Sequence, residues 1–477
     1  MHEETTVFEG GDEIGGLQAR GALRGSAAGF AQPRGADLLR RTEPLDAWCA
    51  LRAEHGLWQY ARAIDGAPAA DACVREEGAA AGGATRGINF ASQDYLSLAA
   101  HPAVREAAAA ALRDAGPHSA GPAGLLGNNR LSLALEAELG ALVQMEHVTL
   151  FPSGWTAAFG AITALVHGRD YVVIDECAQP ALRQGAGAAT GNVVAHRHLD
   201  TGHVREILAA IRARDDGGRS SRGNSGDHGI LVVTEGLFGT DAEVPDLPLL
   251  QHLCREYGAT LLVDVAHDLG VLGPGGTGSP GEQKMLGKVD LVTGSFSKTF
   301  ASNGGFVASA SRAVKRQLQL FSGFQLCSSA MSPVQAACVL EALRIARSVE
   351  GDARRAALLK NALALRAHLA EAGVHCLGRP APIVPLWVGR EPVARLAGRT
   401  LACEGVFVDA LEFPGVAPGA ARLRLQVTAD HRPGQLRQGA RAIGAAVSGA
   451  AIVVKSALGT LGIEPAPRPR RREWGRG

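Results

Sequence analysis

The 477-residue sequence predicts an α/β protein with a large domain, built on a mainly parallel sheet between helices, and a smaller α+β domain after it. Short apolar runs alternate with helical segments over residues 147–307, which is typical of a parallel sheet covered on both faces. Hydrophobic residues make up 46% of the chain, enough to bury a large core. Beyond about residue 335 long helices alternate with short strands, which favours a second, smaller domain.

The chain divides by composition into five parts. Residues 1–43 are rich in Gly and Ala without sustained periodicity, so we expect them to lack regular structure. Residues 44–88 begin with apolar side chains at helical spacing and continue as a linker. The large domain is predicted at 89–335 and the small domain at 336–450, followed by a Pro/Arg-rich tail at 451–477. A basic tail can contact nucleic acid or acidic lipid, but a solvated end is the simpler interpretation.

Charge and cysteine usage exclude several classes of function. The formal net charge is +1, so no global field attracts nucleic acid or an anionic membrane. The eight cysteines form no CxxC pair, which argues against a zinc site or a disulfide framework. No apolar run approaches the length of a membrane span, and the N-terminus is acidic rather than signal-like. We therefore expect a cytoplasmic protein without a membrane span, a nucleic-acid partner or a metal.

The elements of the large domain follow from local patterns taken in order. A helix is predicted over 103–115 after a His-Pro turn, and a second amphipathic helix over 131–143. The Gly-rich segment 117–130 between them is either a plain connection or a ligand or subunit contact. The polar Gly/Ser insertion 214–229 is predicted to be a surface loop. Strands are predicted in GINFAS (87–92), at the start of HVTLFPSGW, in DYVVID (170–175), NVVAH (192–196), GILVVTE (229–235) and TLLVDVAHD (260–268), and in the two apolar runs between Asp290 and Val307.

Lys298 is the most informative residue of the sequence, because it follows a buried strand and lies between Ser297 and Thr299. An ammonium group in such a low-dielectric place is costly unless it has a use. A desolvated lysine can form a Schiff base, and pyridoxal phosphate is the aldehyde that proteins hold in this way. The alternative is a solvated loop lysine of no chemical importance.

Asp264 and His267 supply the partner that this cofactor requires. Asp264 ends another apolar run, and His267 follows three positions later. A carboxylate there can keep the pyridine nitrogen protonated, which makes the ring an electron sink. Asp264 alone would more often be a turn or cap residue. The pairing of Asp-x-x-His with a later Ser-x-Ser-Lys is what favours the cofactor site.

A phosphate cradle is predicted where a strand passes into a helix at Ser153, Gly154 and Trp155. The free backbone N–H groups and the dipole of a helix N-terminus bind phosphate. Any βα junction can contain Ser-Gly, so the signal depends on the candidate cofactor. Asp175 and Glu235 also end strands, and ligands of such sheets bind at the carboxyl ends of the strands.

Together these residues resemble the α-oxoamine synthase family of pyridoxal-phosphate enzymes. The resemblance implies the aminotransferase-type fold, fold type I, with a seven-stranded, mainly parallel sheet. It also implies a homodimer with active sites at the subunit interface. The implied reaction condenses an amino acid with an acyl thioester of CoA or a carrier protein, with decarboxylation, to give an α-aminoketone. The resemblance covers residues 89–430 and rests on NFASQDYLSL, SAGPAGLLGNN, LFPSGWTAAFG, VVTEGLFGTD, LLVDVAHDLGVLG, TGSFSKTFASNGGF and ARLRLQVTADH.

The resemblance also implies roles for individual residues. Lys298 matches the Schiff-base lysine, Asp264 the partner of the pyridine nitrogen, and His267 the histidine at the cofactor's 3-oxygen. One arginine of RLRL matches the clamp for the substrate carboxylate, although a charge at a strand edge is the alternative. The cofactor-binding set is Ser153, Gly154, Trp155, Gln179, Glu235, Asp264, His267, Ser295, Ser297 and Lys298, and the substrate set is Gln93, Arg422 and Arg424.

Several positions depart from the family pattern. Gln179 stands where the family stacks a histidine on the cofactor ring, and an amide stacks poorly. Gln93 replaces an asparagine, Ser132 a histidine and Gly239 a serine, and Glu412 stands where some members carry an arginine. These changes leave two alternatives to the condensation. One is transamination on the same fold, and the other is a non-catalytic subunit that pairs with an active homologue.

Overall fold

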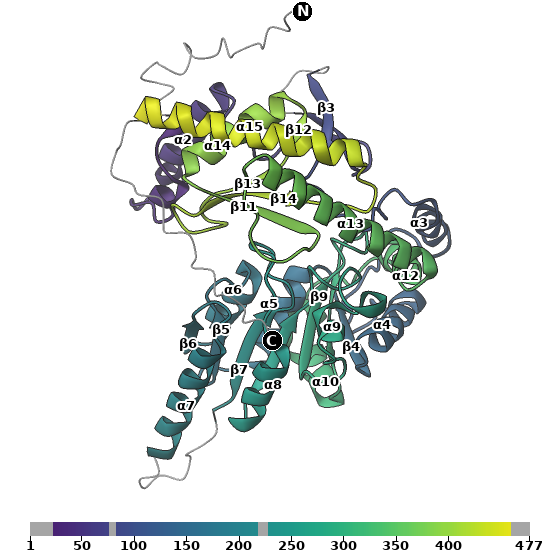
Figure 1. The fold of residues 1–477 in the computed structure, drawn as a ribbon. Helices are drawn as coiled ribbons and strands as arrows, with labels where there is room; N and C mark the ends of the chain where they lie inside the picture. The colour runs from purple at the N-terminus through teal and green to yellow at the C-terminus, as the bar shows by residue number, and fades with distance from the viewer. Residues whose placement is uncertain (1–21, 76–82, 218–227, 459–477) are drawn as a thin grey trace, which may run out of the picture. The chain divides into compact units, whose positions relative to one another are not determined.

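The computed structural model describes residues 22–75, 83–217 and 228–458 (Figure 1). The chain forms two compact units. The large unit comprises Gln93–Lys360 with Thr428–Asp430, and the small unit comprises Met1–Ser92, Asn361–Val427 and His431–Gly477. Parts of the expected N-terminal extension, of the polar insertion and of the Pro/Arg tail lie outside the described residues.

The large unit is built on a seven-stranded sheet with the strand order β4-β10-β9-β8-β7-β5-β6. Every neighbouring pair is parallel except those that β10 makes with β4 and β9. This arrangement confirms the predicted α/β class and the mainly parallel sheet. The strands are β4 His147–Phe151, β5 Tyr171–Asp175, β6 Val193–His196, β7 Ile230–Glu235, β8 Thr260–Asp264, β9 Leu291–Ser295 and β10 Gly305–Ser309.

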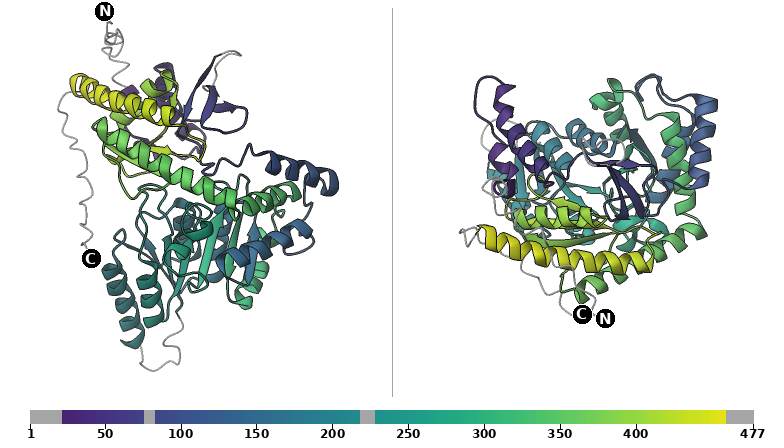
Figure 2. Two further views of the ribbon diagram at one scale, coloured as in Figure 1. Left: turned by 45° about the vertical axis from the view of Figure 1, so that its right-hand side comes forward. Right: turned by 90° about the horizontal axis from the view of Figure 1, so that it is seen from above.

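Helices surround this sheet, as Figure 2 shows from two further directions. The strands β7, β9 and β10 are buried along their whole length, as expected for strands that are covered on both faces. Helix α5 packs against β9, β10 and α6, and its alanine-rich face forms the core there. The helices are α3 Pro102–Ala115, α4 Arg130–Val143, α5 Gly154–Leu165, α6 Pro180–Ala189, α7 Thr201–Gly217, α8 Leu247–Glu256, α9 Gly278–Glu282, α10 Arg312–Phe321, α11 Gly323–Leu326, α12 Pro333–Ala346 and α13 Val349–Glu371, with the 3₁₀ turn η5 Pro274–Gly276.

The small unit contains two sheets and two long helices. One sheet has the order β1-β2-β3-β12 and the other the order β11-β14-β13. In the second sheet β14 is the central strand and pairs antiparallel with both neighbours. The elements are η3 Ala27–Phe30, η4 Arg40–Thr42, α2 Glu43–Glu54, β1 Ala63–Asp65, β2 Asp71–Arg75, β3 Ala84–Asn89, β11 Ile383–Gly389, α14 Glu391–Cys403, β12 Val406–Phe407, β13 Asp409–Leu411, β14 Ala421–Gln426 and α15 Pro433–Leu458.

The N-terminal part of the chain is more structured than its composition indicated. The helix that the sequence predicts after residue 44 ends at Glu54, because Gly56 takes a left-handed conformation with φ +65°. In the first sheet, β1 lies at the end of the segment predicted to be helical, and β2 and the start of β3 lie in the segment 66–87 that was expected to be a linker. Within the described ranges, every helix is too short or too polar to cross a lipid bilayer.

Candidate active site

The predicted cofactor residues of the large unit meet at the carboxyl ends of its parallel strands. Asp175, Glu235, Asp264 and Ser295 are the last residues of β5, β7, β8 and β9. Register places Glu235 beside Asp264, and Asp264 beside Thr293 of β9. Parallel strands end at one edge of a sheet, so side chains distant in sequence form one cluster.

Asp264 is almost fully buried, and each of its carboxylate oxygens has a fixed donor. Oδ1 accepts the backbone N–H of Ala266 at 2.9 Å, and Oδ2 accepts the hydroxyl of Thr293 at 3.0 Å. Burial raises the pKa of Asp264, whereas these bonds, a bond from the side chain of Gln179 and the charge of Lys298 lower it. The effect of burial is the larger, so the pKa of Asp264 is raised overall. The buried carboxylate would therefore be stabilised by a further cationic donor, such as a protonated ring nitrogen.

Lys298 lies just past the end of β9, where the chain bends, and its side chain is half-buried. Its charge acts on Asp264, which places the two groups in one electrostatic neighbourhood. The hydroxyls of Ser295 and Ser297 lie 2.7 Å apart at the same strand end. The expected amine, carboxylate and hydroxyl groups therefore share one site.

His267 is buried, and its ring is held by a residue far away in the sequence. The hydroxyl of Tyr95 lies 3.0 Å from Nδ1 of His267. On the other side of the ring, a Cβ at Gly239 would lie 2.5 Å from Nε2. Glycine at 239 is thus required for the histidine to take this position, which gives a physical reason for the missing serine.

The predicted phosphate cradle is the N-terminus of α5. Ser153 caps the helix, since its side chain accepts the N–H of Thr156 at 3.1 Å. Helix α5 begins at Gly154, where a Cβ would lie 2.4 Å from Cβ of Ser295. Gly305 of β10 also approaches the backbone of Gly154 closely. These glycines bring the helix N-terminus, with its unpaired N–H groups, against the Ser295 hydroxyl.

We expect Gly154→Ala to weaken cofactor binding, because the new methyl group must push α5 away from Ser295. The cost of such overpacking is about 1 to 3 kcal/mol, which corresponds to a rise of about 5-fold to 150-fold in the Kd for pyridoxal phosphate. Fluorescence titration of the apo-protein measures this change. Gly187→Ala is the matched control, since a Cβ at that exposed helical glycine meets nothing within 4 Å. An unchanged Kd in Gly154→Ala would contradict the cradle.

Glu235 fastens the loop that carries Gln179. Its Oε1 accepts the backbone N–H of Gln179 at 2.7 Å, and the N–H of Gly239 is a second donor. The side chain is buried beside Asp264, and burial followed by the charge of Asp264 raises the pKa of Glu235 to about 8. Glu235 therefore holds two loops of the site. It also keeps its proton at pH values well above those at which a carboxyl group usually ionises.

We expect the folded protein to lose stability as the pH rises, and we expect Glu235 to cause part of this loss. The folded chain retains a proton there between the ordinary pKa of 4.5 and about 8, whereas the unfolded chain releases it. The free energy of unfolding therefore falls as pH rises through this window, by about 1 kcal/mol per pH unit for this group. Urea unfolding at several pH values should show a flatter slope for Glu235→Gln than for the exposed control Glu206→Gln. Equal slopes would contradict the assignment.

Comparison with known proteins agrees with this geometry. Residues 85–443 match the family described as aminotransferase class I and II. The 8-amino-7-oxononanoate synthase of Trichlorobacter lovleyi is 34% identical over 74% of this chain and 87% of its own length. The enzyme of the same name from Geobacter sulfurreducens is 32% identical over 75% of this chain and 88% of its own. The chain belongs to the α-oxoamine synthases. It is a pyridoxal-phosphate-dependent enzyme.

Solved structures show the same fold. The serine palmitoyltransferase of S. paucimobilis with bound PLP matches 87% of this chain and all of its own, with a TM-score of 0.78 and 23% identity. This likeness concerns the fold, whereas the curated relatives carry the family assignment. The predicted α-oxoamine synthase resemblance and the cofactor are confirmed.

The side chains of the large unit fit the cofactor of the α-oxoamine synthases. A helix N-terminus freed of Cβ atoms at Gly154 suits a phosphate, and the buried Asp264 suits a protonated ring nitrogen. A half-buried amine at Lys298 acts electrostatically on the same carboxylate. Trp155 is 45% exposed at the start of α5, so its backbone N–H rather than its ring belongs to the cradle.

The predicted substrate residues lie in both units. Gln93 begins the large unit, and its carbonyl accepts the N–H of Tyr95. In the small unit Arg422 and Arg424 are two positions apart on β14, so both side chains leave the same face of the strand. The guanidinium of Arg422 lies over the ring of Trp387, and that of Arg424 pairs with Asp409 at 3.0 Å.

Glu412, which replaces an arginine of some family members, belongs to a buried ion cluster of the small unit. It accepts hydrogen bonds from Nε of Arg395 at 2.9 and 3.0 Å, and Arg52 lies 3.4 Å away. Trp48 of α2 packs over Arg52. The position is therefore occupied by structural ion pairs that join α2 to α14 and to the chain after β13.

Sequence reasoning missed two residues that hold the site. Tyr95 orients His267 and Thr293 donates to Asp264. Thr293 could have been found, because it lies two residues before Ser295 and therefore on the same face of β9. Tyr95 could not, since no local pattern links it to a histidine 172 positions later.

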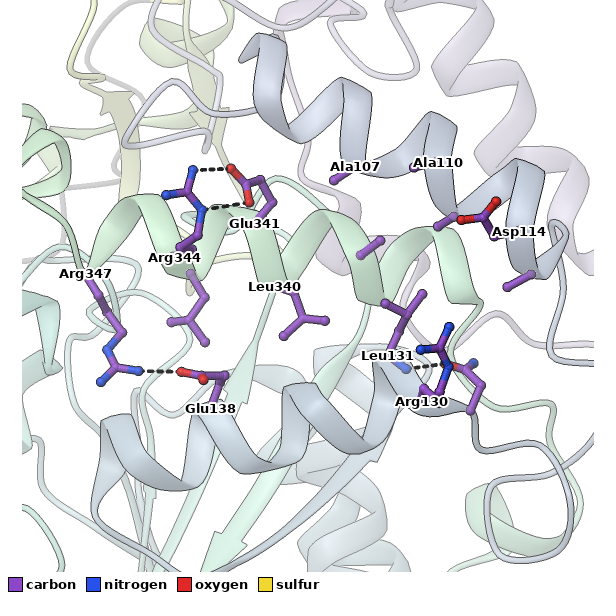
Figure 3. Close-up of a pocket in the computed structure, with 15 residues that line it drawn as sticks. Ala107, Ala110, Asp114, Arg130, Leu131, Glu138, Leu340, Glu341, Arg344 and Arg347 are labelled. Atoms are coloured by element: carbon purple, nitrogen blue, oxygen red, sulfur yellow. Dashed lines mark hydrogen bonds and ion pairs between the residues drawn. The ribbon is translucent and has the colours of Figure 1, made fainter.

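A pocket of about 1040 Å³ lies elsewhere in the large unit, among α3, α4 and α12 (Figure 3). Alanine and leucine side chains line it, and the ion pairs Glu341–Arg344 and Glu138–Arg347 border it. None of the predicted cofactor residues lines this pocket. We therefore assign it no part in the chemistry at the strand ends.

Proposed function

We propose that this enzyme condenses an amino acid with an acyl thioester, with loss of the amino acid's carboxylate as CO2, and forms an α-aminoketone. The observation that supports the proposal is the meeting of Asp264, His267 and Lys298 at one sheet edge in a chain of this family. Bound pyridoxal phosphate would supply an electron-accepting ring that stabilises negative charge at the substrate Cα.

The chain's own residues would bind and orient the reactants. Asp264 would keep the ring nitrogen protonated, and Lys298 would bind the aldehyde and then take the proton from Cα. His267, held by Tyr95, would donate to the ring's 3-oxygen. The phosphate would bind to the α5 N-terminus with Ser153, Gly154, Trp155, Ser295 and Ser297, and Gln179 and Glu235 would contribute to the cofactor site.

We assign the substrate carboxylate to Arg422 or Arg424 and a polar contact to Gln93. A planar guanidinium suits a carboxylate because it can donate two parallel hydrogen bonds. Arg424 already has Asp409 as an anionic partner, whereas Arg422 is buried over Trp387 with its Nη1 on the carbonyl of Ala420. Substituting each arginine by lysine and comparing KM for the amino acid decides between them.

The function is tested by first naming the amino acid. Purified enzyme is titrated spectrally with each of the twenty amino acids, and those that perturb the cofactor spectrum are then incubated with acyl-CoA and acyl carrier protein thioesters. We expect stoichiometric release of thiol and of CO2 from the carboxyl-labelled amino acid. No release with any pair would contradict the proposal.

Transamination is the second candidate, because Gln179 stands where the family stacks a histidine. Its side chain bonds to Asp264 and its backbone N–H to Glu235. An amide cannot reproduce the stacking of an imidazole on the ring. Amino-group transfer to a keto acid without release of CO2 would favour this reaction. The non-catalytic subunit that the sequence departures left open is set aside, because the chain is a pyridoxal-phosphate-dependent enzyme.

We propose a homodimer whose interface includes an apolar surface of the large unit. Leu125 and Leu126 are 69% and 91% exposed in the loop before α4, and Leu320 and Phe321 are 60% and 65% exposed at the end of α10. The two segments are adjacent, because the N–H of Gly124 bonds to the carbonyl of Gln325 just beyond α10. Four large exposed apolar side chains in neighbouring segments are typical of a protein interface.

We expect Leu126→Glu to convert the dimer into monomers, since a buried unpaired carboxylate costs several kcal/mol. Light scattering after gel filtration measures the mass, and activity should fall with it if the sites lie at the interface. Leu359→Glu, at a leucine 50% exposed on α13, is the control. A monomeric wild type, or a dimeric Leu126→Glu, would overturn the interface.

The eight free cysteines suit a reducing compartment, and we propose a cytoplasmic location.

A further inference from the structure

Asp175, one of the strand-end residues, comes together with Cys177 and His198, so that an oxygen, a sulfur and a nitrogen lie at one place. Asp175 ends β5, Cys177 follows in the loop before α6, and His198 lies in the loop between β6 and α7. Their ligand atoms all lie within 4.8 Å of one another. None of the three has a role in the proposed condensation.

Asp175 is the fixed element of this group. It is 1% exposed, and its Oδ1 accepts the N–H of Cys177 at 2.8 Å while Oδ2 accepts the N–H of Leu199 at 3.0 Å. Nδ1 of His198 lies 2.7 Å from Oδ1. Two loops are therefore tied to one carboxylate, which holds Cys177 and His198 in place without a further ligand.

His198 is also held from behind. Its Nε2 lies 3.0 Å from Oε2 of Glu243, and the ring of Phe238 meets it edge-on with centroids 4.5 Å apart. A carboxylate on the outer nitrogen of an imidazole is the arrangement that surrounds metal-ligating histidines, because it fixes the tautomer and strengthens the inner nitrogen as a ligand. This second contact distinguishes the group from a simple Asp–His pair.

We infer that Asp175, Cys177 and His198 form a binding site for a divalent cation of the zinc class, with Glu243 as the outer partner of the histidine. Carboxylate oxygen, thiolate sulfur and imidazole nitrogen are all zinc ligands, and three of them leave one position for water. Cys177 is exposed, so a cation can enter from solvent. The expectation from cysteine spacing considered CxxC pairs alone, and this inference departs from it.

A cation would take the place of the hydrogen bond between Asp175 and His198. Tetrahedral zinc separates its ligand atoms by about 3.3 to 3.8 Å, so the 2.7 Å contact between these side chains must widen by about 0.6 to 1.1 Å.

The site adjoins the loop that carries Gln179. The N–H of Ala178 bonds to the carbonyl of Asp175, and the N–H of Gln179 bonds to Glu235. A cation on Asp175 and Cys177 would fix this loop from its outer side, as Glu235 fixes it from the inner side. Zinc would thereby position the residue that replaces the stacking histidine.

The test measures zinc bound to the reduced holoenzyme by equilibrium dialysis and elemental analysis, with the metal alone as the probe. Cys177→Ser keeps the size of the side chain, and His198→Asn keeps a hydrogen-bond donor to Asp175 while providing a poor zinc ligand. Cys403→Ser is the matched control, because Cys403 is an exposed thiol of the small unit.

We expect the wild type and Cys403→Ser to bind one zinc per chain with equal Kd, and both site variants to bind at least about tenfold more weakly. A wild type that binds no zinc, or site variants that bind zinc like the wild type, would each overturn the inference and leave an ion pair that holds two loops together.

Discussion

Lys298→Ala is expected to abolish turnover, with a fall in kcat of at least about 10⁴-fold, because the variant has no amine to bind the aldehyde or to take the Cα proton. Lys298 is half-buried beyond β9 and its charge acts on Asp264, so both tasks depend on one group in one place. Borohydride reduction followed by peptide mass analysis should find a pyridoxyl group on the peptide containing Lys298 in the wild type and none in the variant. Lys298→Arg should behave alike, since a guanidinium keeps the charge but forms no Schiff base.

Lys288→Ala is the control for this experiment, because Lys288 is an exposed lysine of the same unit whose Nζ only contacts the carbonyl of Lys284. It should retain wild-type activity and labelling. Pyridoxyl mass on any other lysine, or turnover that survives in Lys298→Ala, would remove the basis of the proposed function. The fold and the family would be unaffected by that result.

The parallel core of the large unit was predictable because the apolar composition of its strands indicates that they are buried. β7 and β8 read as apolar runs that end in Glu235 and Asp264, and such runs are buried on both faces. The strand order was not predictable. β10 follows β9 closely in the chain but inserts between β9 and β4 in antiparallel direction, and only the packed sheet decides that choice.

The reactive residues of the site were easier to predict from the sequence than the residues that hold them in place. Residues at strand ends meet by topology alone, so Asp264, Ser295 and Lys298 could be placed together without coordinates. Their hydrogen-bond partners come from distant segments, as Tyr95 does for His267. The same limit applies to Glu412, whose partners Arg52 and Arg395 come from separate helices of the small unit.

Asp264→Asn is expected to lower kcat by about 10³-fold, roughly 4 kcal/mol, while leaving the Schiff base with Lys298 intact. Asparagine keeps the shape of the side chain and the bonds from Ala266 and Thr293 can be retained in part. The neutral amide, however, would not stabilise a protonated ring nitrogen, and an unprotonated ring withdraws electrons poorly. Steady-state kinetics measure the fall, and borohydride labelling shows that the cofactor is still bound.

A graded effect distinguishes electrostatics from simple disruption. Thr293→Val removes the hydroxyl that donates to Oδ2 of Asp264, and loss of one hydrogen bond to a carboxylate should cost about tenfold in kcat. Asp268→Asn is the matched control, since this neighbouring buried acid accepts the N–H of Ser279 and has no assigned contact with the ring. If Asp268→Asn lost as much activity as Asp264→Asn, or if Asp264→Asn stayed within tenfold of the wild type, the buried carboxylate of β8 would not be the group that activates the ring.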